Sequence, residues 1–169
     1  MSREAAAPIA ARLDAVLAAE ERLYVELRDA LQHERDCMVR LDVEGLEAVA
    51  AAKEALADEA ALLEESRRAV ADELAAALGL PAASTLSALS ERLAGAGGVL
   101  RERHSRLVAL LAAVAELVDA NAGFARESLA QVRETIASLG RLLPTEPVYA
   151  PGGARAAAAG PGRLVERVA

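Results

Sequence analysis

Residues 13–41 read LDAVLAAEERLYVELRDALQHERDCMVRL and decide the fold. Mostly apolar residues recur there at alternating intervals of three and four, at positions 13, 17, 20, 24, 27, 31, 34, 38 and 41. This spacing lays one stripe of side chains along one face of a helix, as in a coiled coil. We therefore expect a long helix that packs against other helices through this stripe.

A second helix is expected to return along the first after a tight turn near Leu41 and Asp42. The Asp42 carboxylate can accept a hydrogen bond from the free amides of the turn that follows. A second stripe runs from residue 46 to residue 78 and ends at Gly79, which tolerates the left-handed conformation of a helix cap. The pattern predicts an antiparallel hairpin over about residues 10–78.

The remaining helical pattern consists of a short and a long segment. Ser84 or Thr85 can cap a short helix over about residues 85–93. A long stripe then predicts a helix over about residues 99–143, which stops before a proline. Between the two segments we expect a hinge or a break at three glycines, Gly95, Gly97 and Gly98.

These elements predict an all-α fold, an elongated antiparallel helical bundle of three long helices plus one short helix over residues 1–143. Residues 144–169 are rich in Pro, Gly and Ala without helical periodicity, so we expect a flexible tail that is disordered when alone. Strands are disfavoured because Ala and Leu dominate and only 2% of the 169 residues are aromatic. This length suits one domain.

Net charge and hydropathy exclude two classes of partner. The net charge of −7 argues against nucleic acid, because phosphates require clustered Lys and Arg. The longest uninterrupted apolar run, Leu107 to Ala115, is about half of what a membrane-spanning helix needs, so we expect no stable membrane insertion. A single cysteine, Cys37, cannot form an internal disulfide. We expect a cytoplasmic protein.

The sequence contains no recognisable motif for catalysis or for phosphate binding. Its two histidines, His33 and His104, lack the Glu-x-x-His spacing of di-metal bundles. Cys37 has no neighbouring cysteine or base motif, so an inert thiol is expected there. We expect no enzyme activity, no metal and no cofactor.

Polar residues interrupt the two stripes of the hairpin at matched intervals. Glu20 and Glu34 lie fourteen positions apart on the first helix, as do Lys53 and Arg67 on the second. In a hairpin that turns near residue 42, the pairs Glu34–Lys53 and Glu20–Arg67 both have indices that sum to 87, so one register serves both. They are either ion pairs that fix the register or solvated charges at the edge of a stripe.

Three features near the C-terminus have both a structural and a functional interpretation. Asn121 interrupts the long stripe, either to specify register or as a satisfied boundary amide. Tyr149 lies between prolines and is either an anchor for a partner or a cap on the end of the bundle. Near the end of the chain, a short helix would have one apolar face made of Leu164, Val165 and Val168. This segment either becomes ordered on contact with a partner or has no binding role.

The order of these features resembles one family, the flagellar export chaperones of the FlgN type. The similarity covers most of the chain. It is carried by a Glu late in the first helix, an Asp-led turn, two basic residues, an Asn in the last helix and a closing tyrosine segment. These are Glu34, DVEGLEAV at residues 42–49, Lys53 and Arg67, Asn121, and TEPVYAPGG at residues 145–153.

The resemblance implies a non-enzymatic chaperone that binds the terminal amphipathic helices of hook-filament junction proteins, prevents their premature assembly and delivers them to the platform of the flagellar export gate. It also implies that the C-terminal region binds cargo and that Tyr149 docks on the platform. The residues expected to contact partners are Asn121, Phe124, Val132, Ile136, Leu139, Leu143, Tyr149, Leu164, Val165 and Val168. The alternative is a self-associating helical scaffold or surface-coating structural protein, which Ala-rich helices would serve equally well.

Overall fold

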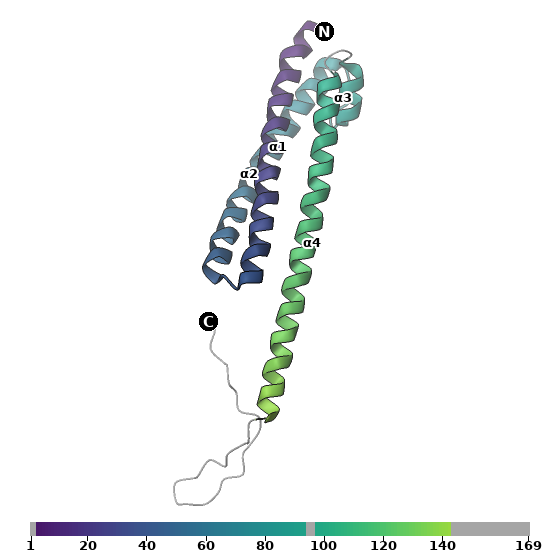
Figure 1. Cartoon of the computed structure of the whole chain (residues 1–169). Coiled ribbons are helices and arrows are strands. Elements are labelled where there is room, and N and C mark those ends of the chain that lie inside the picture. The colour runs from purple at the N-terminus through teal and green to yellow at the C-terminus, as the bar shows by residue number, and fades with distance from the viewer. Residues whose placement is uncertain (1–2, 94–96, 143–169) are drawn as a thin grey trace, which may run out of the picture. The chain divides into compact units, whose positions relative to one another are not determined.

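The computed structural model describes residues 3–93 and 97–142, and within these residues it contains four helices and no strand (Figure 1). Helix α1 spans Arg3–Arg40, α2 spans Val43–Leu78, α3 spans Leu86–Arg92 and α4 spans Gly97–Leu142. The expected all-α fold, with three long helices and one short helix in this order, is confirmed.

The turn between α1 and α2 forms where the sequence predicts it. Leu41 adopts a left-handed backbone conformation (φ 57°), and the N–H of Asp42 donates to the carbonyl of Cys37 at 3.0 Å. The Asp42 carboxylate accepts a hydrogen bond from the N–H of Gly45 at 2.9 Å and caps α2. A Cβ atom on Gly45 would lie only 2.7 Å from Cys37 Sγ, so a larger residue there would force the neighbouring side chains to shift.

Helix α2 ends as its sequence indicates. Gly79 has φ 69°, and its N–H donates to the carbonyl of Ala76 at 3.2 Å. The N–H of Leu80 donates to the carbonyl of Ala75 at 2.8 Å, which completes a Schellman cap. The Leu80 side chain packs against the core and fixes the direction in which the chain leaves the helix.

The segment around α3 distinguishes between two predicted caps. Thr85 Oγ1 accepts a hydrogen bond from the N–H of Ala88 at 3.3 Å, so Thr85 is the cap. Ser84 Oγ donates instead to the carbonyl of Pro81 at 2.6 Å.

Helices α3 and α4 are separate, as the glycines predict, but α4 begins earlier than expected. Gly97 and Gly98 lie inside the first turn of α4, and Gly95 falls outside the described residues. The reason is packing, because a Cβ on Gly97 would lie 2.7 Å from the carbonyl carbon of Ser90. At Gly97 the glycine permits a close approach of α3 and α4 rather than a hinge.

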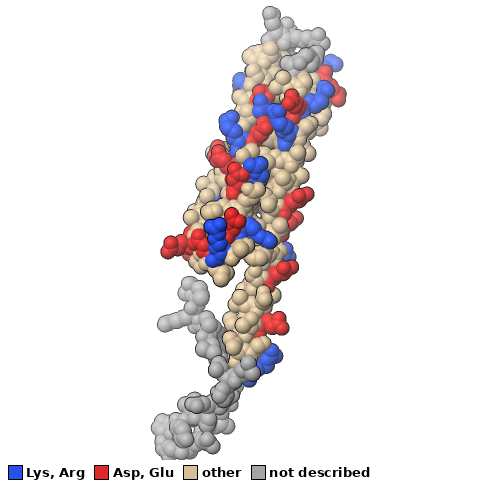
Figure 2. Space-filling view, in the orientation of Figure 1, with Lys and Arg blue, Asp and Glu red and all other residues tan. Residues whose placement is uncertain are grey.

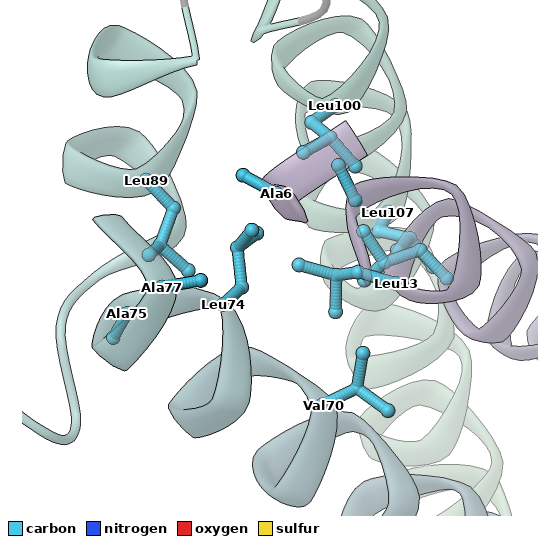
Figure 3. Packing of buried hydrophobic residues seen from close by; sticks show 11 residues of the cluster. Ala6, Leu13, Val70, Leu74, Ala75, Ala77, Leu89, Leu100 and Leu107 are labelled. Carbon is cyan, nitrogen blue, oxygen red and sulfur yellow. The ribbon is translucent and has the colours of Figure 1, made fainter. Parts of the chain in front are cut away.

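One hydrophobic core joins all four helices (Figure 3). Its largest side chains are fully enclosed leucines, and small alanines fill the spaces between them. Two buried alanines, Ala6 and Ala10, explain why α1 begins before the stripe that starts at Leu13. The members of the core are Ala6, Ala10, Leu13, Leu17, Val70, Leu74, Ala75, Ala77, Leu89, Leu100 and Leu107.

The chain divides into two compact units, residues 1–123 and residues 124–169. The core belongs to the first unit. Within the second unit, the described residues are 124–142, which are helical as the last part of α4.

Candidate functional site

The structure brings together both residue pairs of the hairpin. Lys53 Nζ on α2 forms an ion pair with the Glu34 carboxylate on α1, and both side chains are half-buried. Arg67 Nε donates to Glu20 Oε1 at 3.1 Å. A single antiparallel register of α1 and α2 therefore accommodates both pairs.

Asn121 of α4 lies against the same part of α1. Its side chain is buried, and its Nδ2 donates to the carbonyl of Leu31 at 2.8 Å and to Glu34 Oε2 at 3.0 Å. Because the other Glu34 oxygen faces Lys53, one carboxylate connects α1 with both α2 and α4. Asn121, which the sequence placed among the partner-contacting residues, is here a buried group that joins helices.

The second pair belongs to a larger charged cluster. Glu20 is only 7% exposed, and burial raises the pKa of its carboxyl although the Arg67 guanidinium opposes this effect. Arg67 Nε also donates to Glu64 Oε2 at 3.0 Å, and this hydrogen bonding lowers the pKa of Glu64. Two carboxylates therefore share the Arg67 guanidinium. Glu64 Oε1 also accepts a hydrogen bond from Arg68 Nε at 2.6 Å.

A half-open groove of about 270 Å³ adjoins this cluster. Residues of α1, α2, α3 and α4 line it, all within the first unit. Its polar lining consists of Glu20, Tyr24, Glu64, Arg67 and His104. Its apolar lining consists of Leu17, Leu86, Leu107, Val108 and Leu111. The groove can receive a side chain with both an apolar and a polar part.

Ion pairs of Arg103 also connect α4 to α1. Arg103 Nε lies 2.6 Å from Asp14 Oδ1, and its Nη1 lies 2.9 Å from Glu21 Oε2. The sequence pattern did not predict this cluster, although Asp14 and Glu21 are seven positions apart and so share one face of α1. On the face in view, basic and acidic side chains are interspersed (Figure 2).

The described part of the second unit carries an exposed apolar stripe. Its members follow one another at intervals of three and four, which places them on one helical face. They are Leu129 (49% exposed), Val132 (54%), Ile136 (61%) and Leu139 (55%). Three of them, Val132, Ile136 and Leu139, are among the expected partner contacts.

The other expected contacts fall into two groups. Phe124 is half-buried and makes an interaction with its surroundings. The remaining residues lie outside the part of the chain that the structure describes, and they are Leu143, Tyr149, Leu164, Val165 and Val168.

The thiol of Cys37 is buried at the end of α1, and burial raises its pKa. Its Sγ lies 3.8 Å from His33 Nε2 and 4.0 Å from Asp42 Oδ2. A raised pKa keeps the group as a thiol at neutral pH, which is the less reactive form. Among the described residues, no three His, Cys, Asp or Glu side chains are arranged to hold a metal ion.

The described residues include one helix that is long and apolar enough to cross a membrane, by length and composition alone. This helix is Gly97–Arg141, with a mean hydropathy of 1.7 in an 18-residue window of which 17% is buried. The same helix binds α1 through Arg103 and Asn121. An apolar helix of this kind also occurs in soluble proteins, so hydropathy alone does not assign a membrane span.

Comparison with known proteins identifies one family. A family model described as FlgN protein matches residues 9–157, which is well over half of the chain. No curated protein and no solved structure matches the chain. The family match includes the hairpin, its ion pairs, Asn121 and the exposed apolar stripe.

Proposed function

The chain belongs to the FlgN family of flagellar export chaperones, and on this premise we propose that its cargo is the hook-filament junction proteins. Membership of this family supports the binding of flagellar cargo proteins. In the proposal, the chain binds the terminal amphipathic helices of the junction proteins in the cytoplasm. It thereby prevents their premature assembly and delivers them to the platform of the flagellar export gate.

The exposed apolar stripe from Leu129 to Leu139 is the observation that supports this cargo. Contiguous exposed apolar residues on a soluble protein commonly mark a surface for a partner. A stripe on one helical face is complementary to the apolar face of another helix. The apolar composition of α4 is then explained by the cargo that it covers.

The expected affinity suits a carrier that must later release its cargo. Burial of four apolar side chains contributes roughly 1.5–3 kcal/mol each, or about 6–12 kcal/mol in all. Loss of translational and side-chain freedom removes several kcal/mol of this gain. A remaining free energy near about −8 kcal/mol corresponds to a micromolar dissociation constant.

The C-terminal residues complete the proposal. We assign docking on the export platform to Tyr149 and additional cargo contacts to Leu143 and to the apolar residues of the terminal segment, Leu164, Val165 and Val168. Tyrosine is suited to such docking because it buries a large area while few torsions become fixed. Residues 1–143 would then act as the helical body and residues 144–169 as the docking segment.

A binding measurement tests the cargo. The probe is a fluorescently labelled peptide of the C-terminal helix of the hook-filament junction protein from the same source, titrated with the full chain. Val132→Gln and Ile136→Gln should each weaken binding about tenfold, because a buried apolar contact is replaced by a polar one. The matched control, Ala130→Gln, puts the same side chain on the far side of the helix and should leave binding unchanged.

The same experiment separates the chaperone from a self-associating scaffold. A scaffold would ignore the peptide and form oligomers whose size falls in the Val132→Gln and Ile136→Gln variants. Light scattering of the free chain and of the peptide complex measures the size of these oligomers. Absence of peptide binding to the wild-type chain would overturn the proposed cargo.

A further inference from the structure

The exposed apolar stripe of the second unit has a counterpart in the first unit. On this earlier part of α4, exposed apolar residues again recur at alternating intervals of three and four, which places them on one helical face. They are Val108, Leu111, Ala115, Val118 and Ala122. The larger three, Val108, Leu111 and Val118, are 52%, 42% and 46% exposed. We call these five residues the outer stripe of the first unit.

The outer stripe is distinct from the face of α4 that packs on the hairpin. That inner face consists of buried residues seven positions apart, Leu107, Val114 and Asn121. Leu107 belongs to the core, and Asn121 donates to α1. Packing of the chain itself therefore accounts for the inner face and leaves the outer stripe with apolar surface in contact with solvent.

The outer stripe and the stripe of the second unit mirror each other in sequence. The second stripe can be extended by Ala125, which is also exposed and precedes Leu129 by four positions. Five pairs between the two stripes then have indices that sum to 247, and these pairs are Val108–Leu139, Leu111–Ile136, Ala115–Val132, Val118–Leu129 and Ala122–Ala125. In an antiparallel pair of helices from two copies, residues with one constant index sum face each other. Small residues at the centre allow the two helices to approach closely.

Charged residues beside the stripes fit the same register. Asp119 and Arg126 are seven positions apart and therefore lie along the same edge of α4. In an antiparallel pair, like edges of the two helices adjoin, and Asp119 lies opposite residue 128 of the second copy. Arg126 of the second copy is only two residues, or about 3 Å along the helix, from that position. A parallel pair would instead leave the two charges about 10 Å apart along the helix.

Asp119 is available for such a contact. Its side chain is exposed, and none of the ion pairs among the described residues involves it. Because the two copies are equivalent, the contact with Arg126 would form twice, once on each side of the two-fold axis. Charge complementarity thus favours a second copy in the antiparallel direction.

We infer that a second copy of this chain covers α4 when no cargo is bound, in an antiparallel pair with two-fold symmetry. Residues 108–139 supply more than four heptads, and apolar repeats sustained over three to four heptads are typical of coiled coils. A two-fold interface is complete with two copies, so the pair does not grow into a scaffold. The inference rests on the proposed function only for what displaces the second copy, because cargo would compete for Val132 and Ile136.

Sedimentation equilibrium of the full chain without cargo tests the association. The wild type should form a dimer at micromolar concentrations. Val118→Gln should raise the dimer dissociation constant at least tenfold, because each dimer contains the substitution twice. The matched control is Val99→Gln, at a site of α4 that is 55% exposed and outside the spacing of the stripe, and it should change the constant by less than twofold. Circular dichroism melting verifies that both variants are folded.

A charge exchange tests the register. Asp119→Arg should weaken the association at least fivefold, because like charges then adjoin across the interface. The double variant Asp119→Arg with Arg126→Asp should recover most of the loss. The two positions are about 10 Å apart along one helix, so recovery reports a contact between copies rather than within one. A double variant that associates no better than Asp119→Arg would overturn the register.

A cross-link tests the direction. In a Cys37→Ser background, Val108→Cys chains mixed with Leu139→Cys chains should be joined by a short bifunctional maleimide. Val108→Cys chains alone should not be joined, because these positions lie at opposite ends of an antiparallel pair. Efficient joining of Val108→Cys chains alone would overturn the antiparallel pair.

The outcomes separate this inference from the proposed function. A wild-type chain that stays monomeric without cargo, yet binds the junction-protein peptide, would overturn the second copy and leave the cargo assignment standing. A dimer that responds to Val118→Gln but ignores the peptide would overturn the cargo and support the second copy. Addition of the peptide to the wild type should convert the dimer into a complex of one chain with one peptide. A dimer that persists with the peptide bound would overturn the shared surface.

Discussion

Asn121 Nδ2 on α4 lies 3.0 Å from Glu34 Oε2 on α1, and the other oxygen of Glu34 faces Lys53 on α2. One carboxylate is thus the common acceptor for two helices. The amide of Asn121 is further held by the carbonyl of Leu31 at 2.8 Å. Because each of these groups needs its partner, the contact fixes the position of α4 along the hairpin as well as the register within it.

Reversal of the Glu34–Lys53 pair tests this arrangement. Lys53→Glu should lower the free energy of unfolding by about 1–3 kcal/mol, since it leaves two carboxylates facing each other in a half-buried site. The double variant Glu34→Lys with Lys53→Glu should recover only part of the loss. The new ammonium at position 34 cannot accept the hydrogen bond from Asn121.

Urea unfolding followed by circular dichroism measures these differences. Glu47→Lys, on an exposed position of α2, is the control and should change stability by less than about 0.5 kcal/mol. A double variant no more stable than Lys53→Glu alone would contradict the pairing. Full recovery would instead show that the Asn121 contact adds nothing.

Two glycines with different surroundings should respond in opposite directions to alanine. Gly45→Ala should destabilise the fold by about 1–3 kcal/mol, because the added methyl group meets the Cys37 sulfur and the capping carboxylate of Asp42. Gly123→Ala should stabilise it by about 0.5–1 kcal/mol, since nothing lies within 4 Å of the new Cβ and alanine favours the helix. Thermal melting of the two variants side by side is the measurement. Stabilisation by Gly45→Ala would show that the turn can relax.

The spacing of residues predicted the helices well, because stripes and caps are local features. The turn at Asp42 and the cap at Gly79 depend on residues that are near one another in sequence. The register of α1 and α2 follows from residue pairs at equal distances before and after one turn, whose indices sum to 87. The stripe of α4 was less informative. Leu107 and Val114, seven positions apart, are buried, whereas Leu111 and Val118 of the same stripe are 42% and 46% exposed. A helix that packs on one side buries only part of a broad apolar face.

Sequence periodicity does not predict contacts between segments that are far apart in the chain. The groove beside Glu20 and the ion pairs of Arg103 depend on how α4 lies against α1, which a one-dimensional pattern does not contain. The role of Gly97, the first residue of α4, was not predicted for a related reason. Gly97 reads as a breaker in isolation, but in the structure it allows the backbone of Ser90 to approach.

Tyr149 should act in delivery and not in folding or cargo binding. Tyr149→Ala should leave the melting temperature and the affinity for the junction-protein peptide unchanged, while secretion of junction proteins in a strain that depends on this chain falls severalfold. Tyr149→Phe, which keeps the ring, is the matched control and should retain most of the secretion. A large fall in the melting temperature of Tyr149→Ala would make the residue a structural cap instead.

Glu20 and Arg67 should contribute unequally to stability, and the difference should depend on pH. Burial raises the pKa of Glu20 in the folded chain above its ordinary value of 4.5, so the folded state holds this proton more tightly than the unfolded state. The carboxyl therefore destabilises the fold as the pH rises through its folded pKa, and this penalty is absent below the unfolded value. Raising the pH from about 4.5 to about 7 should lower the stability of the wild type relative to Glu20→Gln.

At about pH 7, Glu20→Gln should change the free energy of unfolding by less than about 1 kcal/mol, because it removes a buried charge together with its ion pair. Arg67→Gln should cost about 2 kcal/mol or more, because Glu20 then stays buried without its cation. Urea titrations of the three proteins across this pH range measure both effects. If the wild type instead gained stability over Glu20→Gln as the pH rose, the attraction of Arg67 would outweigh the cost of burial, and the sign assigned to the Glu20 pKa shift would be wrong.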